Sequence, residues 1–110
     1  MSDALLVVTN CPDDAAADRI ALALVEQRLA ACVNRLASVE SVYRWRGRVE
    51  RATEVPLLIK TTRERYGELE QAIRQMHPYD VPEIIALPIE LGHAAYLRWI
   101  SEQTTAALIA

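Results

Sequence analysis

The sequence predicts an α+β fold, namely a ferredoxin-like βαββαβ sandwich with a long hairpin between its second and third strands and a C-terminal helix. Apolar runs and stretches of helical periodicity follow one another in that order along the chain. The 110 residues suffice for one core, and 52% hydrophobic with 25% charged residues is typical of a well-packed soluble protein. We therefore treat residues 1–110 as a single domain.

The first strand and helix are predicted from the N-terminal part of the chain. Residues 5–9 form a continuous apolar run, which is typical of a central strand. Asn10 or Cys11 is expected to cap the following helix, with Pro12 in its first position. The apolar face of this helix is expected to consist of Ile20, Leu22, Leu24, Val25 and Leu29.

Residues 32–61 are predicted to form one long hairpin with Gly47 at its turn and Pro56 at an edge or a bulge. Tyr43 and Trp45 share one face because side chains alternate along a strand. Arms of this length reach about 40 Å, so the ribbon overhangs its own sheet and leaves an uncovered face. Tyr43 and Trp45 are therefore predicted to anchor an interface with another copy of the chain.

The second half of the chain completes the pattern. Thr61 and Glu64 have the spacing of a capping box at the start of a second helix, which Pro78 must end. The core-facing stripe of that helix is expected to be Tyr66, Leu69, Ile73 and Met76. Residues 84–89 then form the last strand, and a tail helix follows Gly92.

Charge and composition limit the possible partners. The net charge of −3 argues against general nucleic-acid binding, and no apolar run approaches the length of about 18 residues that spans a bilayer. The N-terminal residues lack the pattern of a secretory signal, so the two cysteines are expected to be reduced thiols in the cytoplasm.

The sequence also suggests that the protein is not an enzyme. It shows no nucleophile–base pattern, catalytic carboxylate pair or phosphate-binding glycine loop. Residues 47–50 resemble part of the acylphosphatase phosphate loop, but they lie at a hairpin tip and Arg51 replaces the loop's second glycine. We therefore reject the acylphosphatase interpretation.

A few residues could carry chemistry. Cys11 is expected at a helix N-terminus, where the helix dipole lowers the pKa of a thiol. We favour a plain capping role for it, and a functional thiolate or soft-metal ligand is the alternative. Cys32 is interpreted as a buried apolar residue. His77 suits a metal ligand and a helix C-terminal cap equally well. The arginines around the hairpin tip are interpreted as a solvated or ion-paired cluster: Arg44, Arg46, Arg48 and Arg51.

Three segments carry a family resemblance: residues 29–34 (LAACVN), 41–47 (SVYRWRG) and 76–84 (MHPYDVPEI). Together they resemble the divalent-cation tolerance proteins of the CutA family over nearly the whole chain. The resemblance implies a cytoplasmic homotrimer involved in tolerance of divalent cations, particularly copper, in which the long ribbons complete the neighbours' sheets. It also places Glu54, Lys60 and Tyr79 along the cleft between subunits.

The resemblance further implies where a metal would bind. Family members credited with a copper site carry a cysteine and two successive histidines at the positions that hold Thr9, Met76 and His77 here. We expect His77 to be the best single ligand, with Met76 or Cys11 as improvised partners. Binding of copper or another divalent ion should therefore be weak, with no tightly held cofactor.

A different function class remains open at this point. The trimeric ferredoxin-like architecture is similar to that of the nitrogen-regulatory PII proteins, whose intersubunit clefts bind small effectors. The alternative hypothesis is therefore a PII-like signalling module that senses a small molecule in these clefts.

Overall fold

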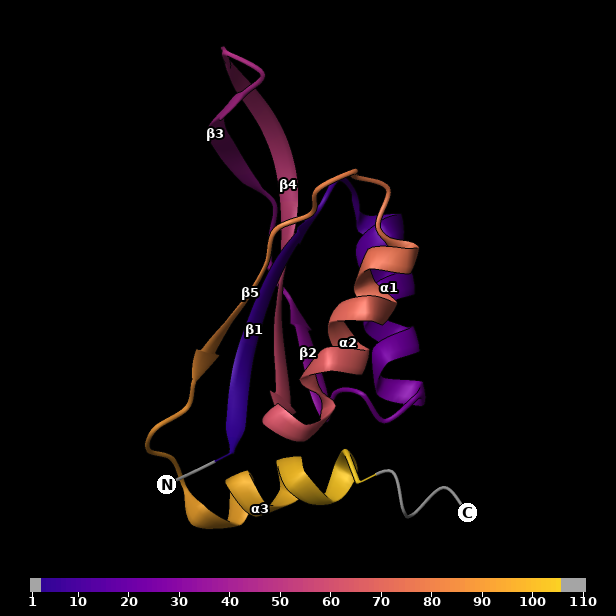
Figure 1. Cartoon of the computed structure of the whole chain (residues 1–110), viewed down its shortest axis with the longest axis vertical. Coiled ribbons are helices and arrows are strands. Elements are labelled where there is room, and N and C mark those ends of the chain that lie inside the picture. Colours follow the sequence, from indigo (N-terminus) through magenta and orange to yellow (C-terminus); the bar gives the residue numbers. More distant parts are fainter. Residues whose placement is uncertain (1–2, 106–110) are drawn as a thin grey trace.

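A five-stranded antiparallel sheet is the frame of the protein in the computed structural model, which describes residues 3–105. The elements are β1 (Ala4–Cys11), α1 (Asp14–Glu26), β2 (Cys32–Arg35), β3 (Val39–Trp45), β4 (Arg48–Thr62), α2 (Arg63–Met76), β5 (Ile84–Pro88) and α3 (Ala94–Gln103). The strand order is β2-β4-β1-β5, and β3 pairs with the first part of β4, from Arg48 to Glu54. Helices α1 and α2 lie together on one face (Figure 1), so the predicted ferredoxin-like fold is confirmed.

The core lies between the central strands and the two helices that cover them. Alternate residues of β1 and β4 point into it, and α1 and α2 supply the opposing side chains: Leu5, Val7, Cys11, Leu57, Ile59, Ala17, Ile20, Leu24, Leu69 and Ile73. The predicted stripe of α2 is confirmed, with Tyr66 and Met76 packed against its rim. Leu22 and Val25 are 58% and 42% exposed, so the apolar face of α1 is narrower than predicted.

Both predicted helix caps were wrong, by one to three residues. Strand β1 continues to Cys11, which pairs with Val55 of β4, and Asp13 caps α1 by accepting a hydrogen bond of 2.8 Å from the Ala16 amide. Thr61 likewise remains in β4, where its hydroxyl donates to the Leu29 carbonyl oxygen at 2.7 Å. Strand pairing thus keeps Cys11 and Thr61 within their strands, and α2 begins without a side-chain cap.

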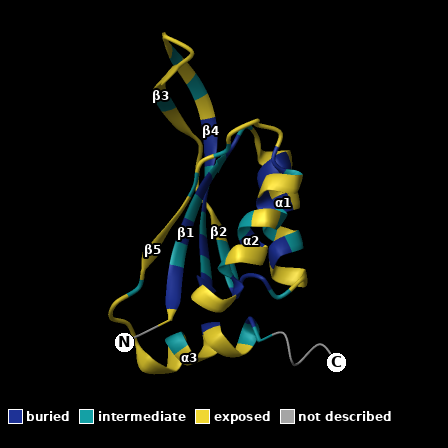
Figure 2. Cartoon of the chain, in the orientation of Figure 1, coloured by how far each residue is buried: buried dark blue, intermediate teal, exposed yellow. Residues whose placement is uncertain are grey.

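The long hairpin is present, but its first arm is broken into β2 and β3. Three residues of the first arm, 36–38, lie opposite two residues of β4, Val55 and Pro56, and this mismatch forms a bulge. Because the ladder is interrupted there, Pro56 loses no hydrogen bond through its missing N–H. Beyond the bulge, β3 and the first part of β4 project past the helices and are mostly exposed (Figure 2). Arg46 and Gly47, both with positive φ, form the two-residue turn, as predicted for Gly47.

The second face of the sheet has no helix layer within residues 3–105 (Figure 1). We call it the open face, and it carries half-buried apolar residues of β1 and β4 beside exposed ones of β5: Leu6, Val8, Leu58, Ile85 and Leu87. Helix α3 crosses one end of the sheet and buries Ile100 against Ala4 and Ala31. None of the three helices described is long and apolar enough to cross a membrane.

Candidate functional site

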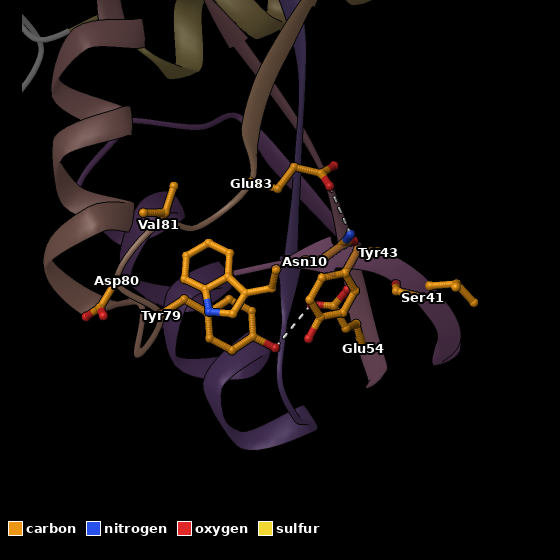
Figure 3. Close-up of a pocket in the computed structure, with 10 residues that line it drawn as sticks. Asn10, Ser41, Tyr43, Glu54, Tyr79, Asp80, Val81 and Glu83 are labelled. Atoms are coloured by element: carbon orange, nitrogen blue, oxygen red, sulfur yellow. Dashed lines mark hydrogen bonds between the residues drawn. The ribbon is translucent and has the colours of Figure 1, made fainter. Parts of the chain in front are cut away.

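A cavity of about 650 Å³ lies at the foot of the hairpin. Four segments build it: the end of β1, the two paired strands β3 and β4, and the loop that follows α2 (Figure 3). Its lining consists of Asn10, Ser41, Val42, Tyr43, Trp45, Glu54, Tyr79, Asp80, Val81 and Glu83. We call this the hairpin cavity. Its size lies within the range of small-molecule sites, about 300–1,000 Å³.

Glu54 and Tyr79 are joined at the floor of the hairpin cavity. Glu54 is only 8% exposed, and its Oε2 accepts a hydrogen bond of 3.1 Å from the Tyr79 hydroxyl (Figure 3). Burial, together with this bond to the carboxylate, raises the pKa of Tyr79 to about 12. The phenol therefore stays protonated at neutral pH and serves as a hydrogen-bond donor.

The lining is acidic. It includes the carboxyl groups of Glu54, Asp80 and Glu83 and contains no lysine or arginine. Asn10 donates a hydrogen bond of 3.4 Å to Glu83, whereas Asp80 lies on the other side of the group, far from Glu83 (Figure 3). Residues 3–105 also contain no cluster of three or more histidine, cysteine, aspartate or glutamate residues suited to a metal ion.

Aromatic side chains form much of the remaining wall. Tyr43 and Trp45 come from β3, and Tyr79 comes from the loop after α2. The guanidinium carbon of Arg46 lies 5.4 Å from the centre of the Trp45 ring, a cation–π distance. Tyr43 and Trp45, which the sequence predicted to form a contact surface, thus line a concave site.

His77 bonds to two lining residues of the hairpin cavity and holds their segments together. Its Nε2 lies 2.7 Å from the Asn10 carbonyl oxygen, and its Nδ1 accepts a hydrogen bond of 3.2 Å from the Tyr79 amide. A carbonyl oxygen can only accept, so the proton belongs on Nε2 and both ring nitrogens are engaged. With His77 only 7% exposed, a metal ion would reach it only after one of these bonds opened.

The other residues implied in copper binding are buried in the core or packed against it. Cys11 is fully buried at the end of β1, and burial, with Asp13 and Glu54 nearby, raises the pKa of its thiol to about 11. The expected lowering by a helix dipole was wrong because Cys11 lies in a strand, inside the core. Thr9 is fully buried, and its hydroxyl has no hydrogen-bond partner among the described residues. Met76 packs against the core, so these residues do not fit a resident copper ion.

Two further predicted residues lie apart from the hairpin cavity. Lys60 is six residues beyond Glu54 on β4, about 20 Å at the usual strand rise, and it donates to the Asn34 side chain. Cys32 faces Lys60 across the β2–β4 pair and is half-buried, outside the core in which it was expected. The structure thus brings together Glu54 and Tyr79 of the three expected cleft residues.

Sequence reasoning missed several residues of this site. Asn10 was considered only as a helix cap and Glu83 only as part of the 76–84 motif. They meet because β1 ends beside the segment that leads into β5. The stacking of Arg46 had a local signal, since the residue follows Trp45 directly at the expected turn. Its positive φ turns the backbone back on itself beside the Trp45 ring.

Comparison with known proteins gives consistent matches. The CutA1 divalent ion tolerance family matches residues 5–103. The divalent-cation tolerance protein CutA of Thermus thermophilus is 46% identical over 99 residues, which cover 90% of this chain and 96% of that protein. A solved structure of the Thermus protein has a TM-score of 0.91 at 45% identity, covering 93% of this chain and 99% of that one.

Two further relatives mark the range of these matches. The CutA homolog of Xenopus laevis is 47% identical over 93 residues, which cover 84% of this chain and 62% of that longer protein. A solved structure from Archaeoglobus fulgidus, described as a periplasmic divalent cation tolerance protein CutA, has a TM-score of 0.90 at 37% identity. It covers 93% of this chain and 99% of that chain.

Proposed function

The chain belongs to the CutA1 divalent ion tolerance family, and from this membership we propose that it acts in the cellular response to divalent cations, copper among them. The family match over residues 5–103 is the observation that carries the proposal. An acidic cavity and a net charge of −3 support it, because both favour cations over anions.

We further propose that the protein functions as a homotrimer. The open face carries Leu6, Val8 and Leu58 without a covering layer, and Ile85 and Leu87 on the edge strand β5 are about half exposed. An apolar sheet face and an unpaired edge are stabilised when another copy covers them. The projecting hairpin, with Tyr43 and Trp45, offers a second contact. These features favour an obligate assembly.

Metal binding in this proposal is weak and reversible. His77 is the best single imidazole for Cu(II), but each of its nitrogens already makes a hydrogen bond. A metal must compete with those bonds, and no cluster of ligands within residues 3–105 assists it. The protein would therefore respond to raised metal concentrations without holding a cofactor.

The proposal also covers compartment and chemistry. We place the protein in the cytoplasm, because Cys11 and Cys32 are both free thiols, as expected in a reducing compartment. We assign it no catalytic role, because the hairpin cavity presents carboxylates, phenols and an indole without a nucleophile–base pair.

One observation supports the alternative of a small-effector sensor. The hairpin cavity is large enough for a small molecule, and it mixes aromatic walls with a few polar groups. Its three carboxyl groups, without a lysine or arginine in the lining, disfavour the nucleotides and other anions that a PII-like module would bind.

Native mass spectrometry of the purified protein tests the proposal in one experiment. We expect the mass of three chains with no metal retained, and reversible adducts when Cu(II) or Zn(II) is added. A monomer at micromolar concentration would contradict the trimer. A retained nucleotide, or a melting temperature raised by nucleotides and not by metals, would favour the sensor instead.

A further inference from the structure

We propose that the hairpin cavity binds a small organic cation, an amine or amidinium group carried on a planar or apolar body. This inference goes beyond divalent-cation tolerance. Because Tyr43 and Trp45 are also the proposed interface residues, it requires the hairpin cavity to stay open in the homotrimer. Three features carry it: the aromatic walls, a guanidinium already stacked on one of them, and a nearly buried carboxylate at the floor.

The aromatic walls suit a positive charge attached to an apolar body. Tyr43, Trp45 and Tyr79 line the cavity together with Val42 and Val81. Aromatic faces attract cations through their quadrupole, and tryptophan does so most strongly. Organic cations lose less hydration energy than metal ions when they leave water, since their charge is dispersed.

Arg46 provides an independent sign of the same chemistry. Its guanidinium lies 5.4 Å from the centre of the Trp45 ring, although the arginine side chain is free to extend into solvent from the hairpin tip. The ring therefore already holds a planar organic cation within this chain. A ligand with an amidinium group would use the same attraction inside the cavity.

The charged groups explain why a ligand should be an organic cation. Glu54 is 8% exposed, and Tyr79 occupies its Oε2, which leaves Oε1 to accept a hydrogen bond from a ligand. Glu83 is held by Asn10, and Asp80 lies apart, so no metal-binding cluster forms. A planar amidinium can reach Glu54 with one N–H and still lie against an aromatic wall.

Three probes of one shape and different charge test the proposal on the full-length protein. They are benzamidine (cationic), benzamide (neutral) and benzoate (anionic). We expect benzamidine alone to bind in calorimetric titration and to move the indole N–H signal of Trp45 in proton–nitrogen NMR spectra. The signal of Trp99, which stacks on Tyr96 in α3 at the other end of the molecule, should stay in place.

Variants locate the binding. Glu54→Gln keeps an acceptor for Tyr79 and removes the charge, and we expect benzamidine to bind at least about tenfold more weakly. Glu50→Gln is the matched control, because Glu50 pairs with Tyr43 in the same hairpin and lies outside the cavity lining. The affinity of this variant for benzamidine should equal that of the wild type.

Four results would overturn the proposal: no binding of benzamidine, equal binding of benzamide, preference for benzoate, or equal losses in both variants. The wild-type comparison of the three probes stands even if Glu54→Gln fails to fold. Failure of the metal proposal is recorded separately, because a Cu(II) titration of the same sample needs no organic ligand.

Discussion

His77 ties the end of α2 to the end of β1, because its Nε2 lies 2.7 Å from the carbonyl oxygen of Asn10. The same ring accepts a hydrogen bond from the amide of Tyr79, which sets the direction of the loop that carries Tyr79 into the hairpin cavity. One nearly buried side chain thus fixes two segments of the candidate site.

Replacement of His77 should therefore cost stability. His77→Ala leaves the Asn10 carbonyl and the Tyr79 amide without a partner, and we expect the free energy of unfolding to fall by about 1–3 kcal/mol. Guanidinium unfolding at fixed protein concentration measures the change. His93→Ala is the control, because His93 is exposed and makes no side-chain cap bond. Equal effects of the two substitutions would contradict the role assigned to His77.

Copper binding should be weak and should depend on His77. Titration with Cu(II) should give a low affinity that is lost in His77→Ala and largely kept in Cys32→Ala, because the thiol faces Lys60 far from His77. Dialysis against a chelator should remove all metal. Stoichiometric metal surviving that dialysis, or unchanged binding in His77→Ala, would show that the ligand lies elsewhere.

Trp45 should contribute more to assembly than its cross-strand neighbour. Trp45 and Arg48 lie opposite each other at the base of the turn, so Trp45→Ala and Arg48→Ala shorten side chains at one register position. We expect Trp45→Ala to weaken the trimer by about 2 kcal/mol, as aromatic interface anchors do, and Arg48→Ala to have little effect. Sedimentation velocity over a dilution series measures this. An unchanged trimer in both variants would remove Trp45 from the interface.

Two buried threonines should respond in opposite directions to the same substitution. The hydroxyl of Thr9 has no partner among the described residues, so Thr9→Val should raise the free energy of unfolding by about 1 kcal/mol. Thr61 donates to the Leu29 carbonyl oxygen, so Thr61→Val should lower it by about 1–2 kcal/mol. Thermal or guanidinium unfolding of the two variants measures both changes. A loss of stability in Thr9→Val would imply that the Thr9 hydroxyl has an acceptor.

Stability should fall in alkaline solution. The pKa of Cys11 is raised from 9.0 to about 11 and that of Tyr79 from 10.0 to about 12, mainly by burial. Between those values the unfolded chain loses protons that the folded chain keeps, so the free energy of unfolding decreases as pH rises from about 9 to 12. Unfolding curves at several pH values measure the slope. Cys11→Ala should flatten the lower part, and no change in slope would contradict the burial of this thiol.

The sequence was sufficient for the fold because local and long-range signals agreed. The apolar run of β1, the stripe of α2 and the turn at Gly47 each have one structural solution at their length. The predictions of the two helix caps were wrong because pairing with the neighbouring strand keeps Cys11 and Thr61 in the sheet. A local motif cannot reveal such pairing, because the partner strand lies more than 40 residues away in one direction or the other.

The site was only partly predictable for the same reason. Trp45 and Tyr79 were identified from their motifs, but the cavity they share depends on the pairing of β3 with β4 and on the path of the loop after α2. The meeting of Asn10 with Glu83 spans 73 residues and leaves no periodic signal. The engagement of both nitrogens of His77 likewise appears only once the chain is folded.

The bulge opposite Pro56 has a consequence for how this chain tolerates insertions and deletions. Because the ladder is interrupted there, adding or removing residues in both arms beyond it leaves the β2–β4 register unchanged. One extra residue per arm would turn Trp45 to the reverse side of the ribbon, whereas two per arm would restore it. Hairpin length in such a chain should therefore vary in even steps on each arm, independently of the core.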